Sequence, residues 1–179
     1  MPVSEVEMVP LSKAENEVKV VTQRLALLHL AYARTLVDEF GWERGKQLVL
    51  DAVKEYGRRV AERTQQGHQS LPKYGFWERR EGRPPICELG KVVLEYGEMD
   101  IGSLYCLIDP AKTMWADPDE KLVHTRCLTV GDEHCEFETA LTTEGERDDF
   151  FGEGRDWAHV DSRLEEYYRM RERSNQGRI

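Results

Sequence analysis

Three cysteines and two histidines lie close together in one stretch of this chain, between residues 106 and 135. They are Cys106, His124, Cys127, His134 and Cys135. Thiolate sulfur and imidazole nitrogen are ligands that zinc prefers, and a structural zinc ion usually takes four of them in a tetrahedral arrangement. Three thiols and one imidazole would complete such a set, so the stretch predicts a metal site or a reactive thiolate.

Each of these residues also has a simpler interpretation. Free cysteines are most often small buried apolar residues, and Cys106 stands among apolar neighbours. Residues three apart on a regular strand point to opposite faces, so His124 and Cys127 can reach one ion only across a bend or a bulge. His134 falls in a predicted turn, where it is either simply exposed or a proton shuttle. Cys87 is a reserve fourth ligand or a core residue.

The composition limits the class of protein. A chain of 179 residues fits one domain with a hydrophobic core and leaves little room for a second enzyme. The formal net charge of −9 at pH 7 argues against nucleic acids and anionic membranes as partners, because phosphate recognition needs a basic surface.

The amino-terminal residues and the hydropathy pattern predict a cytoplasmic protein. The first residues lack the basic and apolar regions of a signal peptide, and no run approaches the roughly 18 to 20 apolar residues of a membrane span. Because thiols stay reduced in the cytoplasm, we expect packing, metal-binding or catalytic cysteines rather than disulfides.

Two helices are predicted in the first third of the chain. Ser12 and Glu15 form a capping-box signature, which predicts the start of a long amphipathic helix that ends near Gly41. Its apolar positions recur at intervals of three and four residues: Val18, Val21, Leu25, Leu28, Tyr32 and Leu36. A second apolar series follows: Leu48, Val49, Ala52, Val53, Tyr56 and Val60. The short connection predicts a helical hairpin or a sharply bent pair.

The middle of the chain predicts a loop, two short helices and a β-hairpin. Glycines and prolines make residues 67–85 a loop between subdomains. Residues 89–96 and 101–114 are then predicted helices, and Pro110 would start or kink the later part of the second one. Residues 121–130 and 135–142 are predicted strands, rich in Val, Leu, Thr and Phe.

The predicted hairpin turns at residues 131–134. Cys127 and Cys135 would then face each other or lie one residue out of register, close enough for two sulfurs to share one ion. Beyond the hairpin, the acidic stretch 144–154 is predicted as a mobile loop. Ser162 with Glu165 would cap a final helix that frays into a polar tail.

These elements predict an α+β fold in which an amino-terminal helical hairpin packs on a small antiparallel sheet with helices. Residues 1–70 would form a helical subdomain, and residues 71–145 an α+β subdomain that binds the ligand and the metal. Residues 146–179 would form a loop and the carboxyl-terminal helix.

Several patches resemble the L-2-amino-thiazoline-4-carboxylic acid hydrolase-like family. Residues 36–45 and 52–57 resemble its helical amino-terminal part, and Cys106-Leu-Ile-Asp109 is similar to its Cys-x-x-Asp motif. Residues 131–137, Gly-Asp-Glu-His-Cys-Glu-Phe, are similar to its Gly-Asp-x-x-Cys-x-Phe motif. The resemblance implies hydrolysis of a small cyclic amidine, thioimidate or amide.

For that reaction, a thiolate at Cys106 or a metal-bound hydroxide would be the nucleophile. Asp109 would be the general acid or base, although it could also serve only as a helix cap. His134, beside acidic residues in the turn, would be a candidate proton shuttle.

The second half also resembles the 4-vinyl reductase domain, a small α+β module that binds ligands in bacterial aromatic-compound sensors. Some of those sensors hold a structural zinc ion. Cys127 and Cys135 have the spacing of the two later cysteine ligands, Cys106 lies where the first belongs, and His124 replaces an acidic ligand. This resemblance implies a 4-vinyl reductase-like fold and a zinc cofactor.

Two functions therefore remain open. One is an enzyme that acts on a small cyclic substrate, and the other is a non-catalytic small-molecule-binding or sensor module with a structural zinc ion. A zinc ion with four protein ligands has no open position for water, so the two functions compete for the same residues. A sensor without a recognisable output segment would act through a partner or as a homodimer.

Overall fold

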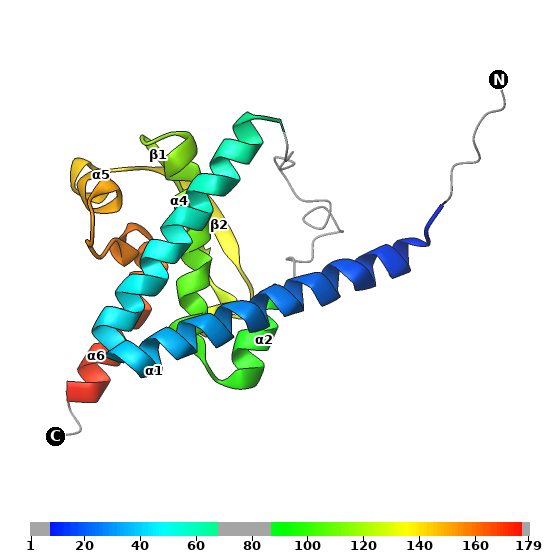
Figure 1. Ribbon diagram of the computed structural model, residues 1–179, viewed down its shortest axis with the longest axis horizontal. Helices are drawn as coiled ribbons and strands as arrows, with labels where there is room; N and C mark the ends of the chain where they lie inside the picture. Colours follow the sequence, from blue (N-terminus) through cyan, green and yellow to red (C-terminus); the bar gives the residue numbers. More distant parts are fainter. Residues whose placement is uncertain (1–7, 68–86, 177–179) are drawn as a thin grey trace.

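The computed structural model describes residues 8–67 and 87–176 and has an α+β fold. A long bent helix, several short helices and a two-stranded antiparallel sheet make up the described part (Figure 1). The predicted loop 67–85 lies outside the described residues except for Gly67. The α+β class is therefore confirmed, while the predicted subdomain boundary stays a prediction.

The helix α1, Leu11–Gln65, bends sharply at Gly41. Gly41 has φ 75° and ψ 167°, a conformation that glycine adopts without the steric penalty of a Cβ atom. The two arms form a V in Figure 1, as a bent pair rather than a closed hairpin. The predicted capping box is wrong, because the helix begins at Leu11 after Pro10 and has no side-chain cap.

For the first arm of α1, which precedes Gly41, the prediction of the face that meets the core is also wrong. Ala26, Leu30 and Ala33 are buried, whereas most of the predicted apolar series is exposed: Val18, Val21, Leu28 and Tyr32. The second arm buries Val49, Val53 and Val60 as expected. Residues 25–33 are apolar around nearly the whole helix, so periodicity alone does not identify the buried face.

Helix α4, Ile108–Ala116, packs between α1 and the sheet (Figure 1). A Cβ atom on Gly57 of α1 would lie 2.6 Å from Cβ of Ala111, so the two helices cross where both residues are small. Trp115 adds a hydrogen bond of 3.2 Å from Nε1 to the carbonyl oxygen of Lys54. These contacts fix α4 against the second arm of α1.

The predicted helix 101–114 is divided into three pieces. They are α3, Met99–Gly102, the 3₁₀ helix η2, Ser103–Leu107, and α4, which has Pro110 in its first turn. Helix α2, Glu88–Tyr96, agrees with the predicted helix 89–96. Cys87 caps α2 through a hydrogen bond of 3.3 Å from the Gly90 amide to Sγ.

The sheet pairs β1, Glu120–Arg126, with β2, Glu136–Leu141. Residues 127–135 connect the strands and include the 3₁₀ helix η3, Leu128–Val130. The strands are thus shorter, and the turn longer, than predicted. Cys127 and Cys135 lie at the two ends of this connection.

The carboxyl-terminal part contains two helices. Residues 144–154 were predicted as a loop, but Glu144–Phe151 form α5, started by a capping box between Thr143 and Glu146. After the 3₁₀ helix η4, Ala158–Val160, comes α6, Ser162–Gln176. The predicted cap at Ser162 is wrong, because Asp161 supplies the acceptor.

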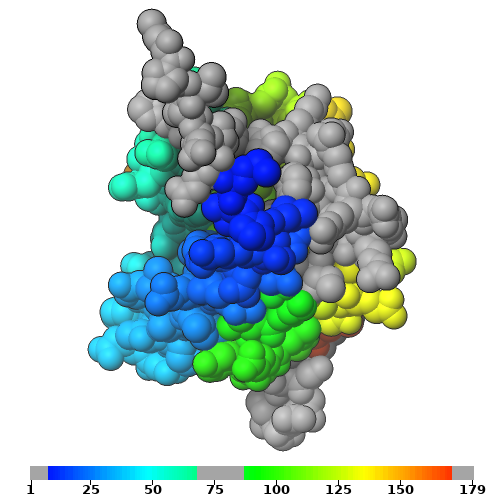
Figure 2. Space-filling view, turned by 90° about the vertical axis from the view of Figure 1, so that its right-hand side faces the viewer, coloured from blue at the N-terminus to red at the C-terminus, as the bar shows by residue number. Residues whose placement is uncertain are grey.

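One hydrophobic core joins all three predicted subdomains: it includes Ala33 of α1, Leu107 and Cys127 of the middle part, and Trp157 and Leu164 near the carboxyl end. In the space-filling view of Figure 2, the amino-terminal arm of α1 lies on the outside of this body. Within residues 8–67 and 87–176, no helix combines the length and the apolar character needed to cross a membrane.

Candidate metal centre

Cys106, His124 and Cys127 form a buried group that could hold a metal ion. Their ligand atoms lie within 4.8 Å of one another. The three residues are 6%, 3% and 0% exposed, respectively. Cys106 comes from η2, His124 from β1, and Cys127 from the start of the connection between the strands. The fold therefore brings together, from separate elements, three residues of the types that bind zinc.

A bulge allows His124 and Cys127 to point to the same side. The pairing register of β1 and β2 shifts between His124 and Arg126. Such an irregularity breaks the strict alternation of side chains along a strand. Cys127 then leaves the strand and begins η3. His124 and Cys127 can therefore reach the same ion, across a bulge as the sequence required.

Cys135 contacts this group without being one of its three closely spaced members. Its sulfur lies within hydrogen-bonding reach of Cys127, and the Cys127 contact raises the pKa of Cys135 to about 11. Cys87 also neighbours Cys135, and this thiol raises the pKa of Cys87. The four cysteines therefore form a chain of adjacent thiols, from Cys106 through Cys127 and Cys135 to Cys87.

Hydrogen bonds to sulfur order this chain. The Thr129 hydroxyl lies 3.3 Å from Sγ of Cys106 and 3.1 Å from Sγ of Cys127. The backbone amide of Leu128 donates to Sγ of Cys135 over 3.4 Å. The Leu128 amide favours a charged Cys135 sulfur, which is the form that binds metal ions, but the neighbouring Cys127 thiol outweighs it.

Asp161 orients His124, and sequence reasoning missed it. The Asp161 carboxylate is fully buried. Its Oδ2 accepts from the backbone amide of His124 over 3.0 Å and lies 2.8 Å from ring Nδ1. Its Oδ1 accepts from the amides of Arg163 and Leu164, both over 3.2 Å, and so caps α6. One carboxylate thus fixes both the imidazole and the start of the last helix.

The hydrogen bonds of His124 decide its charge. Burial disfavours the imidazolium, but the hydrogen bonds with Asp161 and Cys127 outweigh burial and raise the pKa of His124 to about 10. With Nδ1 held by Asp161, Nε2 is the ring nitrogen left for the contact with Cys127. Nε2 lies 3.9 Å from Oδ2 of Asp109.

The candidate catalytic residues are divided between two places. Asp109, on α4, lies next to His124 and forms an ion pair with Lys112. His134 lies in the connection between the strands, and its Nε2 contacts Oε1 of Glu136 over 2.8 Å. The structure therefore places Asp109 near His124, while the contact of His134 is with Glu136 on the exposed side of β2.

No family model, curated protein or solved structure matches this chain. The two resemblances noted in the sequence stay predictions.

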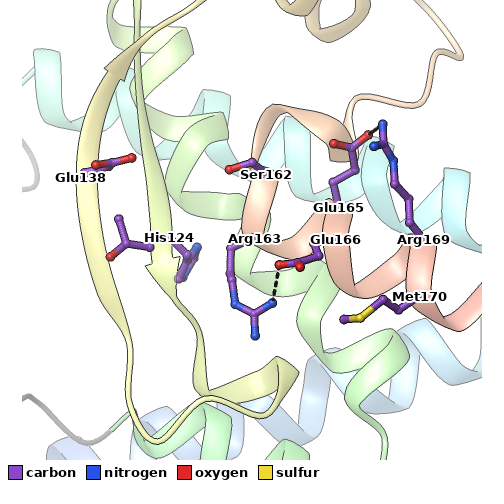
Figure 3. A pocket seen from close by; sticks show the side chains of 9 residues that line it. His124, Glu138, Ser162, Arg163, Glu165, Glu166, Arg169 and Met170 are labelled. Carbon is purple, nitrogen blue, oxygen red and sulfur yellow. Dashed lines mark hydrogen bonds and ion pairs between the residues drawn. The ribbon is translucent and has the colours of Figure 1, made fainter.

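An open cleft of about 810 Å³ lies beside His124, between the β-hairpin and α6 (Figure 3). Its charged side chains are largely paired with one another. Arg163 binds both carboxylate oxygens of Asp132, over 2.7 and 3.0 Å, and contacts Glu166. Arg169 pairs with Glu165. The cleft therefore offers few uncompensated charges to a charged substrate.

The Asp132 and Arg163 pair also supports the cysteine-bearing connection. The Arg163 guanidinium lowers the pKa of Asp132, so its carboxylate stays charged at neutral pH. The backbone amide of Cys127 donates to this carboxylate over 2.7 Å. The pair thereby ties α6 to Cys127, the first residue after β1.

Proposed function

We propose that this chain is a zinc-binding domain in which one ion, held by Cys106, His124, Cys127 and Cys135, has a structural role. The observation that carries the proposal is the buried Cys106–His124–Cys127 group, whose ligand atoms lie within 4.8 Å of one another. Bound there, zinc would join η2 to the β-hairpin, two elements far apart in the chain.

The donor set favours zinc over other common metals. Magnesium and calcium prefer oxygen ligands, whereas thiolate and imidazole suit zinc. A second feature supports a metal role for His124. A histidine that binds a metal usually donates the N–H of its other ring nitrogen to a carboxylate or another acceptor, which fixes the tautomer. Asp161 holds Nδ1 of His124 in this manner.

Cys135 decides between a structural and a catalytic ion. With three protein ligands, zinc keeps an open position for water, as catalytic sites do, whereas a fourth ligand closes it. Cys135 contacts Cys127, is only 7% exposed, and accepts an amide hydrogen bond. We propose that its sulfur completes the ligand set of an ion held by the other three residues.

Metal analysis with two cysteine variants tests the proposal. The purified protein should bind one zinc ion per chain, with its thiols reacting only after chelation. Cys135→Ser should weaken zinc binding, and Cys87→Ser, the matched control at the far end of the thiol chain, should retain it. Failure to bind zinc would contradict the proposal. Unchanged affinity in Cys135→Ser would show an open site with three protein ligands.

A hydrolase acting on a small cyclic amidine, thioimidate or amide is the second candidate. The observation in its favour is that His124 belongs both to the buried group and to the wall of the cleft. In that case Cys106 would supply the nucleophile, and Asp109 would transfer the proton to the leaving atom.

Thiol reactivity separates the two candidates. A hydrolase of this type predicts one fast-reacting thiol, at Cys106, and substoichiometric metal. The structural centre predicts stoichiometric zinc and slow thiols. A 2-amino-thiazoline carboxylate serves as the test substrate, and turnover that is abolished in Cys106→Ser would favour the enzyme.

A further inference from the structure

The amino-terminal arm of α1 carries an apolar stripe that its own core does not cover. The stripe consists of residues spaced alternately by three and four: Leu11, Ala14, Val18, Val21, Leu25, Leu28 and Tyr32. Val21 is 63% exposed and Tyr32 is 67% exposed. This alternation is that of the a and d positions of a coiled coil. The pattern therefore indicates a helix seam that lacks its partner.

The stripe continues into an apolar groove between the two arms of α1. The groove has a volume of about 350 Å³. Leu28 and Tyr32 of the stripe form one wall, and Val53 and Tyr56 of the second arm form the other, with Tyr105 at the base. Stripe and groove together make one continuous apolar surface.

We propose that this surface binds a second copy of the chain, through antiparallel pairing of the two amino-terminal arms of α1. In an antiparallel pair, the a residues of one helix lie opposite the d residues of the other. A register centred between residues 19 and 20 places Val18 opposite the partner's Val21. The same register places Leu11 opposite the partner's Leu28, and Ala14 opposite the partner's Leu25. The small Ala14 thus meets the larger Leu25.

The charges that flank the seam select this orientation. Glu17 and Arg24 are both exposed and occupy the same flanking heptad position. In the antiparallel register, each Glu17 lies opposite the partner's Arg24, so the dimer gains two opposite-charge contacts. In a parallel pair, Glu17 would instead lie near the partner's Thr22 and Arg24 near the partner's His29, with no such contact.

The shape of the molecule leaves room for this pairing. The amino-terminal end of α1 extends beyond the rest of the body in Figure 1 and lies at the front of the molecule in Figure 2. Antiparallel pairing puts the two bodies at opposite ends of the seam. Met8 and Leu11, which are exposed before and at the start of α1, would then reach the partner's groove.

The dimer should be weak enough to dissociate on dilution. The seam from Leu11 to Leu28 spans about two and a half heptads, close to the lower length limit for helices that stabilise one another. Apolar contacts in the groove add to it. We therefore expect a monomer–dimer equilibrium in the micromolar range, near −8 kcal/mol of association free energy by the standard conversion.

Charge reversal tests both the dimer and its direction. Sedimentation analysis of the full chain over a range of concentrations would give the dissociation constant. Glu17→Arg and Arg24→Glu should each weaken the dimer about tenfold, because each variant replaces two attractions by two repulsions. The double variant should restore the wild-type constant to within about threefold. Single variants without effect, or a double variant that stays weak, would overturn the antiparallel register.

A pair of apolar substitutions tests the surface itself. Val21→Glu at the centre of the seam should leave a folded monomer. Leu141→Glu is the matched control, since Leu141 on β2 is 77% exposed and lies outside the stripe; it should leave the dimer unchanged. Circular dichroism would verify that both variants fold. A wild-type chain that is monomeric at all concentrations, or a dimer that survives Val21→Glu, would overturn the proposal.

Discussion

Replacing Asp161 by asparagine tests the zinc proposal through a residue that does not itself bind the ion. The wild-type carboxylate accepts two hydrogen bonds from His124 and two from the amides that begin α6. Asparagine caps helices about as well as aspartate, so α6 should keep its cap. The amide nitrogen would then take the place of Oδ2 and oppose the backbone N–H of His124.

The substitution should change the tautomer of His124. Because the new amide nitrogen is a donor, Nδ1 of the ring must accept, and the proton moves to Nε2. A protonated Nε2 cannot bind a metal ion. Turning the amide over would restore the contact with His124 only by breaking the cap of α6. Asp161→Asn should therefore weaken either zinc binding or the cap of α6.

The expected magnitude follows from comparable carboxylate–histidine–metal arrangements. Loss of such a partner weakens metal binding by about 10- to 100-fold, which corresponds to about 1.4 to 2.7 kcal/mol. With zinc in excess, zinc stabilises the wild type against unfolding. In the variant, this added free energy of unfolding should be smaller by the same amount. Competition with a chromophoric chelator measures the affinity, and urea unfolding with zinc or with a chelator measures the stability.

A second helix cap provides the matched control. Thr143 caps α5 through a hydrogen bond from the Glu146 amide to Oγ1, over 3.2 Å. Thr143→Ala should destabilise the protein by about 1 kcal/mol, equally with and without zinc, and should leave zinc affinity unchanged. If Asp161→Asn bound zinc within about threefold of the wild type while its helices stayed intact, the proposed role of Asp161 would be refuted.

Two further predictions concern stability alone. Gly41→Ala should lower the free energy of unfolding in urea by about 1 to 2 kcal/mol, since the φ of 75° strains any residue with a Cβ atom; an unchanged midpoint would show that the bend relaxes. Burial raises the pKa of Glu146, but hydrogen bonds with Lys121 and Thr143 outweigh burial and lower it, so the charged form stabilises the fold. Glu146→Gln should therefore be less stable than the wild type at about pH 7, by about 1.5 kcal/mol, and the difference should vanish as the pH falls through the lowered pKa; a difference that grows in acid would contradict this sign.

The helices were predictable where local signals agreed with burial. Helix α2 combines a cap, an apolar face and a carboxyl-terminal Gly97. The sharp bend at Gly41 was also within reach, because a glycine separates two apolar series. For α1, however, the sequence carries two apolar faces, and only tertiary packing decides that Ala26 and Leu30 meet the core while Val21 does not.

Helix α5 shows a signal that was present and overlooked. Thr143 and Glu146 have the spacing of a capping box, which outweighs the acidic and glycine-containing composition of residues 144–154. At α6, Ser162 was a reasonable cap by type, but Asp161 one residue earlier takes the position. A shift of one residue is within the usual uncertainty of helix ends.

The candidate centre was predictable in its members but not in its geometry. Residue types suggested Cys106, His124 and Cys127, and these three lie together. The position of Cys135 depends on how residues 127–135 fold, and this connection is longer than the tight turn that its glycine suggested. The contact between Asp161 and His124 joins positions 37 residues apart, so no local sequence pattern predicts it.

X-ray absorption at the zinc edge directly tests whether Cys106, His124, Cys127 and Cys135 bind one zinc ion. For the purified, zinc-loaded protein, we expect three sulfur ligands at about 2.3 Å and one nitrogen ligand at about 2.0 to 2.1 Å. Cys135→Ser should show one sulfur fewer, and Cys87→Ser should leave the spectrum unchanged. A spectrum dominated by oxygen ligands, or a protein that takes up no zinc, would contradict the account.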